Sequence, residues 1–580
     1  MKAAKKTGKK LRKKTAKKAA KRTKKAAKKV AKKAAKKIAK KAAKRVAQKA
    51  AKQAATKTGK KAGKTVAKKP TRKPTPKPTP TPARKTARKP AKSGTVLRGI
   101  SDIRRFFYRN QTPYYFVSAT NFNVMGIDEW VHNFRYINYI DCFDGAHPNL
   151  LCPPELPHEQ FTSIEDINDY LLGHPDVVSY IQRRAVGDAK GRAVFLMFDE
   201  RTERRCRDLG LEICFPPSAL RNQVDDKISA TRIADRAGIA SVPNVLAPVK
   251  TFGDLQRVAK KLGPDLVVQT AFGDSGHTTF FISGEADWKK HGAEIAEAPE
   301  VKIMKRIRCR GAALEACVTR HGTIVGPLMT ELVGFPELTP YRGGWCGNEV
   351  VPEAFSQQVR DQAARTATAF GNELWKMGYR GYFELDFLRD LDTDRVYLGE
   401  VNPRVTGASA MTNLASFAHA DAPLFLFHLL EYAGVDYELD TAELNRRWAD
   451  PQNIDRWGQL VIKHTSDSVE LITEAPRTGV WRMEADGQIV FDHPQTHRRT
   501  VDDESEAFFL RISRPGDYFY EGADIGILIS PGRMMTDDFQ LNERAQAWIR
   551  GIRAHYKSRP LGAASAVDAL PVQVGDFKIM

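Results

Sequence analysis

The chain has 580 residues and a formal net charge of +27, which is distributed very unevenly. Residues 1–100 hold 41 of the 94 Lys and Arg and none of the 67 Asp and Glu, so a polycation precedes a mildly acidic body. The seven cysteines are scattered without a C-x-x-C pair, which argues against a disulfide framework or a zinc site and fits a reducing compartment. No apolar run approaches the roughly 18 residues of a membrane span, and none follows the basic start as in a signal peptide. We therefore expect a soluble cytoplasmic protein without a membrane span.

Residues 1–95 are predicted to be a disordered basic tail. From Lys17 to Ala55 the sequence is almost entirely Lys and Ala, and like charges four residues apart oppose the helix that both residue types favour. A spacer, PTRKPTPKPTPTPA at residues 70–83, predicts an extended polyproline-like chain. The tail resembles those of linker histones and their bacterial Lys/Ala-rich counterparts, which implies a nucleic acid partner and association with the nucleoid. Other polyanions are the alternative partners, since the binding would rest on counterion release.

The body begins with a predicted α/β layer. β-prone runs at 114–118, 134–143 and 192–198 alternate with helical segments around 162–184 and 200–210. This rhythm is typical of a parallel sheet. Residues 265–283, DLVVQTAFGDSGHTTFFIS, then predict two strands joined by a loop in which Gly273 and Gly276 permit close backbone approach to phosphate oxygens. A plain hairpin turn is the alternative interpretation of that loop.

Residues 381–404, GYFELDFLRDLDTDRVYLGEVNPR, predict a β-hairpin with acidic residues on both strands. Period-2 alternation places Glu384 and Asp386 on one face of the first strand. On the second strand it places Glu400 and Asn402 on one face, together with Val396 and Leu398. Pairing of the strands would gather hard oxygen ligands of the kind that Mg²⁺ prefers, and a fixed cation, Arg404, follows. The alternative is an exposed hairpin with ordinary surface carboxylates.

This hairpin resembles the metal-binding end of the ATP-grasp superfamily, which includes biotin carboxylase, D-alanine–D-alanine ligase and amino-acid ligases. The family's G-x-x-x-x-[DE]-[FL] run matches residues 381–387. The resemblance implies ATP with Mg²⁺ (or Mn²⁺) as cofactors, with Asp386, Glu400 and Asn402 as the metal ligands. It also implies that Arg404 is the catalytic basic residue near the reacting phosphate.

The same resemblance extends to the nucleotide site. Lys227 matches the first ATP-contacting lysine, and the glycine loop matches the phosphate flap. Residues 301–318 resemble the strand and hinge that meet adenine. The family usually has Lys where this chain has Gln269, so we expect Lys305 or His277 to compensate. The implied nucleotide-binding residues are Lys227, Gln269, Gly273, Ser275, Gly276, His277, Lys305 and Ile307, with Met304 also at the hinge.

Several further segments are weaker candidates. The loop at 119–123 is a candidate substrate contact, because the family's leading domain usually helps to form the substrate side of the cleft. Gly407 and Ser409 are candidates for the acceptor side. Residues 343–350, GGWCGNEV, are expected to form a Gly-rich loop before a long helix at 352–378.

The resulting fold class is α/β, with an α+β ATP-grasp part. We expect a tail at 1–95, a Rossmann-like pre-ATP domain at 96–220, an ATP-grasp domain at 221–440 and a mostly β domain with a final helix at 441–580. The implied activity is an ATP- and Mg²⁺-dependent ligase that activates a carboxylate as an acylphosphate for attack by an amine or another nucleophile. Biotin carboxylase-type carboxylation is one alternative, although VTGASAM after Arg404 lacks that enzyme's continuation. The other is a nucleoid-associated scaffold with a degenerate ATP-grasp body, suggested by Gln269.

Overall fold

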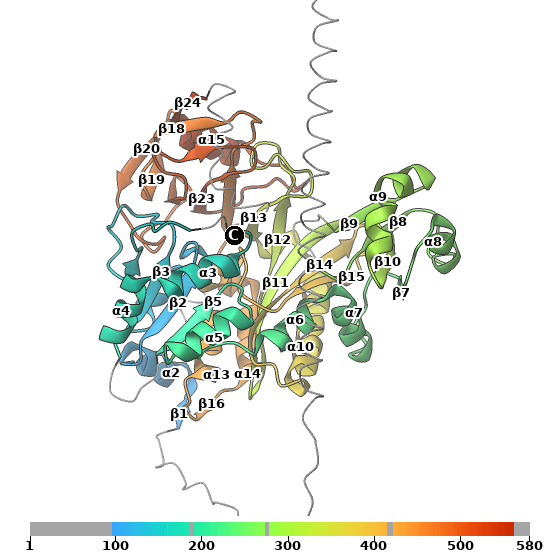
Figure 1. The fold of residues 1–580 in the computed structure, drawn as a ribbon, viewed down its shortest axis with the longest axis horizontal. Helices are drawn as coiled ribbons and strands as arrows, with labels where there is room; N and C mark the ends of the chain where they lie inside the picture. The colour runs from blue at the N-terminus through green and yellow to red at the C-terminus, as the bar shows by residue number, and fades with distance from the viewer. Residues whose placement is uncertain (1–95, 159–160, 186–190, 273–277, 415–420, 562–580) are drawn as a thin grey trace, which may run out of the picture. The chain divides into compact units, whose positions relative to one another are not determined.

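The computed structural model describes residues 96–158, 161–185, 191–272, 278–414 and 421–561. The predicted tail therefore lies outside the described residues, as do Gly273, Ser275, Gly276 and His277. The described chain has a mixed α/β fold, as predicted from the sequence. It contains three larger sheets and two small ones (Figure 1). No helix in these ranges is long and apolar enough to cross a bilayer.

The first sheet is parallel, with the strand order β4-β3-β2-β5-β6. Every residue of the central strand β2 is buried, as expected for a parallel strand that is covered on both faces. The predicted strand–helix alternation is thus confirmed. The strands are β2 (Tyr114–Ser118), β3 (Phe134–Asn138), β4 (Leu150–Leu151), β5 (Arg192–Phe195) and β6 (Glu212–Ile213), and the helices are α2 (Gly99–Tyr108), α3 (Ile164–Gly173), α4 (Pro175–Arg183) and α5 (Glu200–Asp208).

The second sheet is antiparallel, with the order β7-β10-β8-β9. In β8 and β9 buried apolar residues alternate with more exposed ones, and one face of the sheet forms a separate apolar cluster with residues of α8 and α9. The strands are β7 (Asn244–Ala247), β8 (Leu266–Gln269), β9 (Thr279–Ile282) and β10 (Val301–Lys305). The helices of this region are α6 (Ser218–Asp225), α7 (Lys227–Arg236), α8 (Phe252–Val258) and α9 (Glu285–Glu297).

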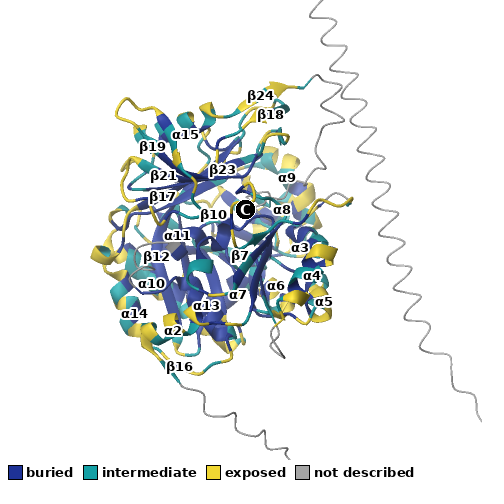
Figure 2. Cartoon of the chain, turned by 90° about the vertical axis from the view of Figure 1, so that its left-hand side faces the viewer, coloured by how far each residue is buried: buried dark blue, intermediate teal, exposed yellow. Residues whose placement is uncertain are grey.

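The third sheet has ten strands, in the order β15-β14-β11-β12-β13-β17-β23-β21-β19-β20. Strands from the predicted C-terminal part therefore continue the sheet that carries the acidic hairpin. Figure 2 shows this sheet largely in the buried colour. Its strands are β11 (Cys309–Thr319), β12 (Gly322–Val333), β13 (Trp345–Val350), β14 (Gly381–Asp390), β15 (Val396–Asn402), β17 (Trp457–Lys463), β19 (Gly479–Met483), β20 (Ile489–His493), β21 (Glu506–Arg511) and β23 (Asp524–Pro531).

The expectation of a Gly-rich loop at 343–350 is wrong, because most of this segment forms β13. Cys346 and Val350 are buried in the sheet. Gly347 has φ 141°, and a Cβ there would overlap the carbonyl of Gln459 on β17. The glycine thus allows close approach of the neighbouring strand, where the sequence suggested a turn.

The long helix predicted at 352–378 is present as α10 (Gln357–Lys376). A 3₁₀ turn at Pro352–Ala354 precedes it, and Ser356 caps its first turn by accepting a hydrogen bond from Val359 N. The remaining elements are helices α11 (Ser409–Leu414), α13 (Leu424–Tyr432), α14 (Thr441–Ala449) and α15 (Glu543–Ala554), and strands β1 (Leu97–Arg98), β16 (Tyr437–Glu438), β18 (Glu470–Glu474), β22 (Tyr518–Phe519) and β24 (Lys557–Pro560).

Candidate functional site

The acidic hairpin forms, and its polar residues face each other across the two strands. In the β14–β15 ladder, Glu384 lies opposite Asn402 and Asp386 lies opposite Glu400. Side chains that are directly opposite in an antiparallel pair have Cβ atoms about 5 Å apart. Three carboxylates and one amide therefore share a small area on one face of the large sheet.

The predicted orientation of Val396 and Leu398 is wrong. The ladder shifts register between Asp386 and Phe387, so that Leu398 pairs with Phe387 and Gly399 is the extra residue of a β-bulge. A Cβ on Gly399 would lie 3.1 Å from Asp386 O, which favours glycine at this point. As a result Val396 and Leu398 pack in the apolar core with Phe387, on the side away from the carboxylates.

Hydrogen bonds join the predicted ligands to two predicted cations. Asn402 Nδ2 donates to Glu384 Oε2 and to Asp386 Oδ2, both at 3.1 Å. Arg404 Nη2 donates to Asn402 Oδ1 at 2.7 Å. Lys227, at the start of α7, places Nζ 2.6 Å from Glu400 Oε1. The structure thus brings together six of the residues that the sequence singled out.

A fourth carboxylate, Glu331 on β12, faces the same cluster. Burial and the charges of Asp386 and Glu400 raise the pKa of Glu331 to about 8. Burial and the charge of Glu400 likewise raise the pKa of Asp386 to about 7, although Arg404, Asn402 and Lys227 oppose this shift. Such shifts mean that not all of these carboxyl groups ionise easily at neutral pH, because the buried site solvates their charges poorly and the neighbouring carboxylates repel them. Glu331 was not predicted from the sequence. It could have been noticed as the one acidic residue in the otherwise largely apolar run of β12.

A second buried network supports the cluster from beside it. Glu315 on β11 is fully buried and accepts a hydrogen bond of 2.5 Å from Ser409 Oγ, together with bonds from Tyr382 and Thr412. Thr406 Oγ1 lies 3.2 Å from Glu315 Oε1 and 3.1 Å from Glu384 Oε1. Since one hydroxyl proton serves only one of these oxygens, the two carboxylates compete for it. Burial, first, and then the charges of Asp386 and Glu315 raise the pKa of Glu384 well above its ordinary range.

The two acceptor-side candidates have structural partners. Ser409 donates to Glu315, as described above, and a Cβ on Gly407 would collide with the indole ring of Trp345. Gly407 therefore lets the turn after Arg404 pack closely on β13.

The residues present fit a divalent cation in their chemistry. Asp386, Glu384, Glu400 and the Asn402 oxygen are hard ligands, and burial together with the neighbouring carboxylates raises the pKa values of Glu384 and Asp386. Among the described residues, however, no three Asp, Glu, His or Cys side chains are grouped as a metal would require. Asn402 Nδ2 lies between two of the carboxylates and Lys227 is bonded to the third, so protein donors take the positions that a cation would use.

The residues predicted to bind the nucleotide differ in their burial and in their contacts. Lys305 is exposed and its backbone N–H donates to Pro243 O, while Ile307 is partly buried. Met304 packs with Val242 and Tyr397 in a small apolar cluster between β10 and the hairpin. Gln269 Nε2 donates to Thr279 Oγ1 at 3.1 Å, and Gln269 Oε1 is buried without a partner among the described residues.

The predicted substrate loop, 119–123, follows the central strand β2 at the switch point of the parallel sheet. The chain adds β3 and β4 on one side of β2 and then returns to add β5 and β6 on the other side. Ligands commonly bind at the carboxyl ends of strands where the strand order reverses in this way. Asn123 Nδ2 donates to Thr406 O at 2.8 Å, which places the loop beside the turn that follows Arg404. Several buried polar atoms of this region have no partner within the described ranges: Ser118 Oγ, Thr120 Oγ1, Asn121 Oδ1 and Nδ2, Asn123 Oδ1 and Asn138 Oδ1.

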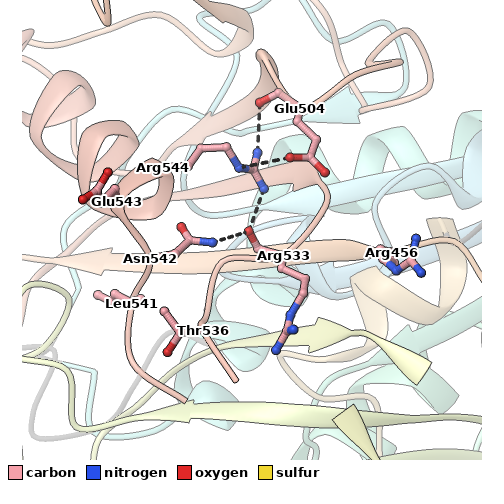
Figure 3. Close-up of a pocket in the computed structure, with 8 residues that line it drawn as sticks. All are labelled: Arg456, Glu504, Arg533, Thr536, Leu541, Asn542, Glu543 and Arg544. Atoms are coloured by element: carbon pink, nitrogen blue, oxygen red, sulfur yellow. Dashed lines mark hydrogen bonds and ion pairs between the residues drawn. The ribbon is translucent and has the colours of Figure 1, made fainter. Parts of the chain in front are cut away.

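The large cavity in Figure 3 is a different place in the molecule, with a volume of about 710 Å³. None of the predicted site residues lines it. Arg544 at the start of α15 donates to the carbonyls of Glu504, Pro531 and Arg533, so it holds loops together. The cavity beside the carboxylates is only about 10 Å³ and is lined by Lys227, Lys302 and Glu400 among others. The chemistry of the side chains, more than the size of the cavity, therefore identifies the site.

The sequence of this chain resembles part of one known enzyme. No family model matches the chain. A stretch of 255 residues is 22% identical to pyruvate carboxylase of Bacillus subtilis (strain 168), and the match covers 42% of this chain and 21% of that enzyme. The match thus spans about a fifth of the length of that curated relative.

The solved structures extend the likeness. The biotin carboxylase domain of the Hydrogenobacter thermophilus 2-oxoglutarate carboxylase, in complex with MgADP, ADP and bicarbonate, has a TM-score of 0.52 at 13% identity and matches 78% of this chain and 92% of its own. Biotin carboxylase of Campylobacter jejuni has a TM-score of 0.51 at 12% identity, covering 77% and 92%. The chain has the ATP-grasp fold of these biotin carboxylases.

We predict that Asp386→Asn stabilises the protein when no divalent cation is present. The substitution removes one ionised group from a crowded cluster and keeps an oxygen that can accept from Asn402. We expect the free energy of unfolding at pH 8 to rise by about 1 kcal/mol. The control is Asp392→Asn in the exposed hairpin turn, where Asp392 pairs with Arg308 at 2.7 Å. Chemical unfolding of both variants in metal-free buffer measures the difference, and a destabilised Asp386→Asn protein would contradict the crowding of charge.

Proposed function

We propose that the chain is an ATP- and Mg²⁺-dependent ligase of the ATP-grasp type. The observation that carries the proposal is the convergence of Glu384, Asp386, Glu400 and Asn402 on one face of the β14–β15 hairpin, beside two cations. Bound Mg·ATP would supply a γ-phosphoryl group that activates a substrate carboxylate as an acylphosphate, from which an amine or another nucleophile displaces phosphate. Such chemistry depends on charge neutralisation and alignment.

The residues of this chain have distinct parts in that proposal. Asp386, Glu400 and Asn402 would hold the cation, with the carboxyl groups of Glu384 and Glu331 beside them. Arg404 has Nη2 on Asn402 and a buried Nε without a described partner, so its guanidinium is held at the edge of the carboxylates, where it would meet phosphate oxygens. Lys227 would exchange its bond to Glu400 for a nucleotide phosphate.

The acceptor is proposed to be a hydrogen-bond donor such as an amine. Three of the unpartnered atoms around the loop at 119–123 can only accept: the amide oxygens of Asn121, Asn123 and Asn138. The hydroxyls of Ser118 and Thr120 can accept or donate, and Asn121 Nδ2 can only donate. Gln459 adds another acceptor, because its Nε2 donates to Gly407 O at 2.9 Å while its Oε1 has no described partner. Buried polar groups without partners are costly, so a ligand that satisfies them binds selectively. The larger number of unpartnered amide oxygens than of unpartnered N–H groups is the reason for preferring an amide-forming reaction to the carboxylation alternative.

The scaffold alternative predicts nucleotide binding without turnover. A screen of carboxylate and amine pairs for ATP-dependent ADP and phosphate release distinguishes the two. Release that one pair stimulates supports the ligase. MgADP binding with no stimulated release by any pair would favour the scaffold.

We predict that Asp386→Asn combined with Glu400→Gln lowers Mg²⁺-dependent ADP formation by more than about 100-fold, because both proposed charged ligands are lost. The matched control, Asp392→Asn, should retain wild-type rates. A coupled ADP assay over a range of Mg²⁺ concentrations measures the effect. Unchanged turnover in the double variant would remove the metal assignment.

We predict that Asn121→Leu raises the KM for the amine at least about tenfold while the KM for ATP is unchanged, because a group that would contact the acceptor is lost. The same change should raise the melting temperature, since two buried polar atoms without partners disappear. Asn168→Leu is the control, because Asn168 also has an unpartnered buried oxygen but lies on α3 and bonds Met197 O. An unchanged amine KM for Asn121→Leu, with raised stability, would contradict the acceptor site.

The tail is proposed to bind nucleic acid, because residues 1–100 contain 41 basic residues and no acidic residue. We predict that deletion of residues 1–95 abolishes binding to duplex DNA and its steep dependence on salt, while MgADP binding is retained. Fluorescence anisotropy of a labelled duplex measures the first property, and calorimetry measures the second. A truncated protein that still binds the duplex would contradict the assignment of DNA binding to the tail. If the full-length protein binds polyphosphate but not DNA, polyphosphate would replace nucleic acid as the proposed partner.

A further inference from the structure

Lys302 is a buried cation that the sequence analysis did not single out. It lies on β10 and only 3% of its surface is exposed. Its neighbour at i+2, Met304, packs on Tyr397 of the hairpin. Alternation along a strand therefore directs Lys302 to the same side, and its Nζ lies 3.5 Å from Gly399 O on β15. The side chain thus points at the bulge beside Glu400.

The environment of Lys302 leaves its charge poorly compensated. The one hydrogen bond described for its Nζ is the long contact to Gly399 O. Burial, first, and then the charge of Lys227 lower the pKa of Lys302 to about 8, in spite of the opposing charge of Glu400. Lysines are very seldom buried in this way unless a partner or a function keeps them there. An anion that enters between β10 and the hairpin would supply the missing partner.

The position of Lys302 in the sheet connects it to Gln269. In the β8–β10 ladder the two residues are directly opposite each other. Directly opposed residues have Cβ atoms about 5 Å apart, which is less than the reach of a lysine side chain. A lysine on either strand can therefore bring its ammonium to the same point between the sheets. Gln269 points to this space with a buried Oε1 that has no described partner.

We propose that Lys302 is the phosphate-binding ammonium of the nucleotide site and replaces the lysine that position 269 lacks. This inference rests on the proposed function, since it assumes that ATP binds beside Glu400. It differs from our expectation that Lys305 or His277 compensates: Lys305 is exposed on β10, with its side chain directed away from Lys302, and His277 lies outside the described residues. Lys227 and Lys302 line the same small cavity with Glu400, one from α7 and the other from β10.

The test compares MgADP with adenosine as probes, both measured by calorimetry on the full chain. For Lys302→Met we expect the Kd of MgADP to rise about tenfold or more, because one charged contact to phosphate is lost, with the Kd of adenosine unchanged. Lys289→Met is the control, because Lys289 lies exposed on α9 and pairs with Glu285 at 3.2 Å, and it should bind both probes like the wild type. The double variant Gln269→Lys with Lys302→Gln exchanges the two groups across the ladder and should restore MgADP binding to within a few-fold of wild type.

Each outcome separates this inference from the proposed function. MgADP binding by Lys302→Met that equals wild type would overturn the inference and leave the ATP site standing. Equal losses for MgADP and adenosine would assign Lys302 a purely structural role and also overturn it. Failure of the exchanged double variant, in a protein that still binds adenosine, would contradict the shared position of the two ammonium groups. If the wild-type chain binds neither MgADP nor adenosine, that result would instead contradict the proposed function.

Discussion

The direct pairing of β14 with β15 is the constraint on which the rest of the site depends. It sets Asp386 opposite Glu400 and Glu384 opposite Asn402 on one face of the large sheet. Like charges placed directly opposite each other destabilise a sheet, and here Glu331 on β12 adds to them. The fold offsets this repulsion with Asn402, Arg404 and Lys227, which bond to or beside the carboxylates. The cluster is therefore organised around positive charge, and a cation that binds there would relieve the remaining repulsion.

The two sides of the site carry opposite charges. The hairpin of the ten-stranded sheet presents carboxylates, while α7 and β10 present Lys227 and Lys302. The ion pair of Lys227 with Glu400 and the small apolar cluster around Met304 hold these sides together. A triphosphate with its metal ion matches this arrangement, because its phosphates would meet the lysines and its cation would meet the carboxylates. The cavity between the two sides has a volume of about 10 Å³ and is lined by Lys227, Lys302 and Glu400 among others.

Much of this arrangement was predictable from sequence because it depends on local periodicity. The alternating hairpin, its polar face, the parallel layer around β2 and the long helix α10 all follow from spacing along one segment. The bulge at Gly399 was not predictable, since it is visible only when both strands are aligned, and it reversed the expected orientation of Val396 and Leu398. Glu331, Glu315 and Lys302 were missed because each lies in an apolar strand and reaches the site only through long-range pairing. The run GGWCGNEV suggested a loop, but most of it forms β13, and Gly347 lets the backbone of β17 approach closely.

The proposed function requires that the hairpin bind a divalent cation through Asp386, Glu400 and Asn402. Mn²⁺ tests it most directly, because it can replace Mg²⁺ and its position is visible by anomalous scattering. In crystals grown with MnADP, the account predicts an anomalous peak in contact with the Asp386 and Glu400 carboxylates, with the Asn402 amide turned so that its oxygen faces the ion. A nucleotide bound with the ion elsewhere, and with Lys227 still on Glu400, would contradict the account.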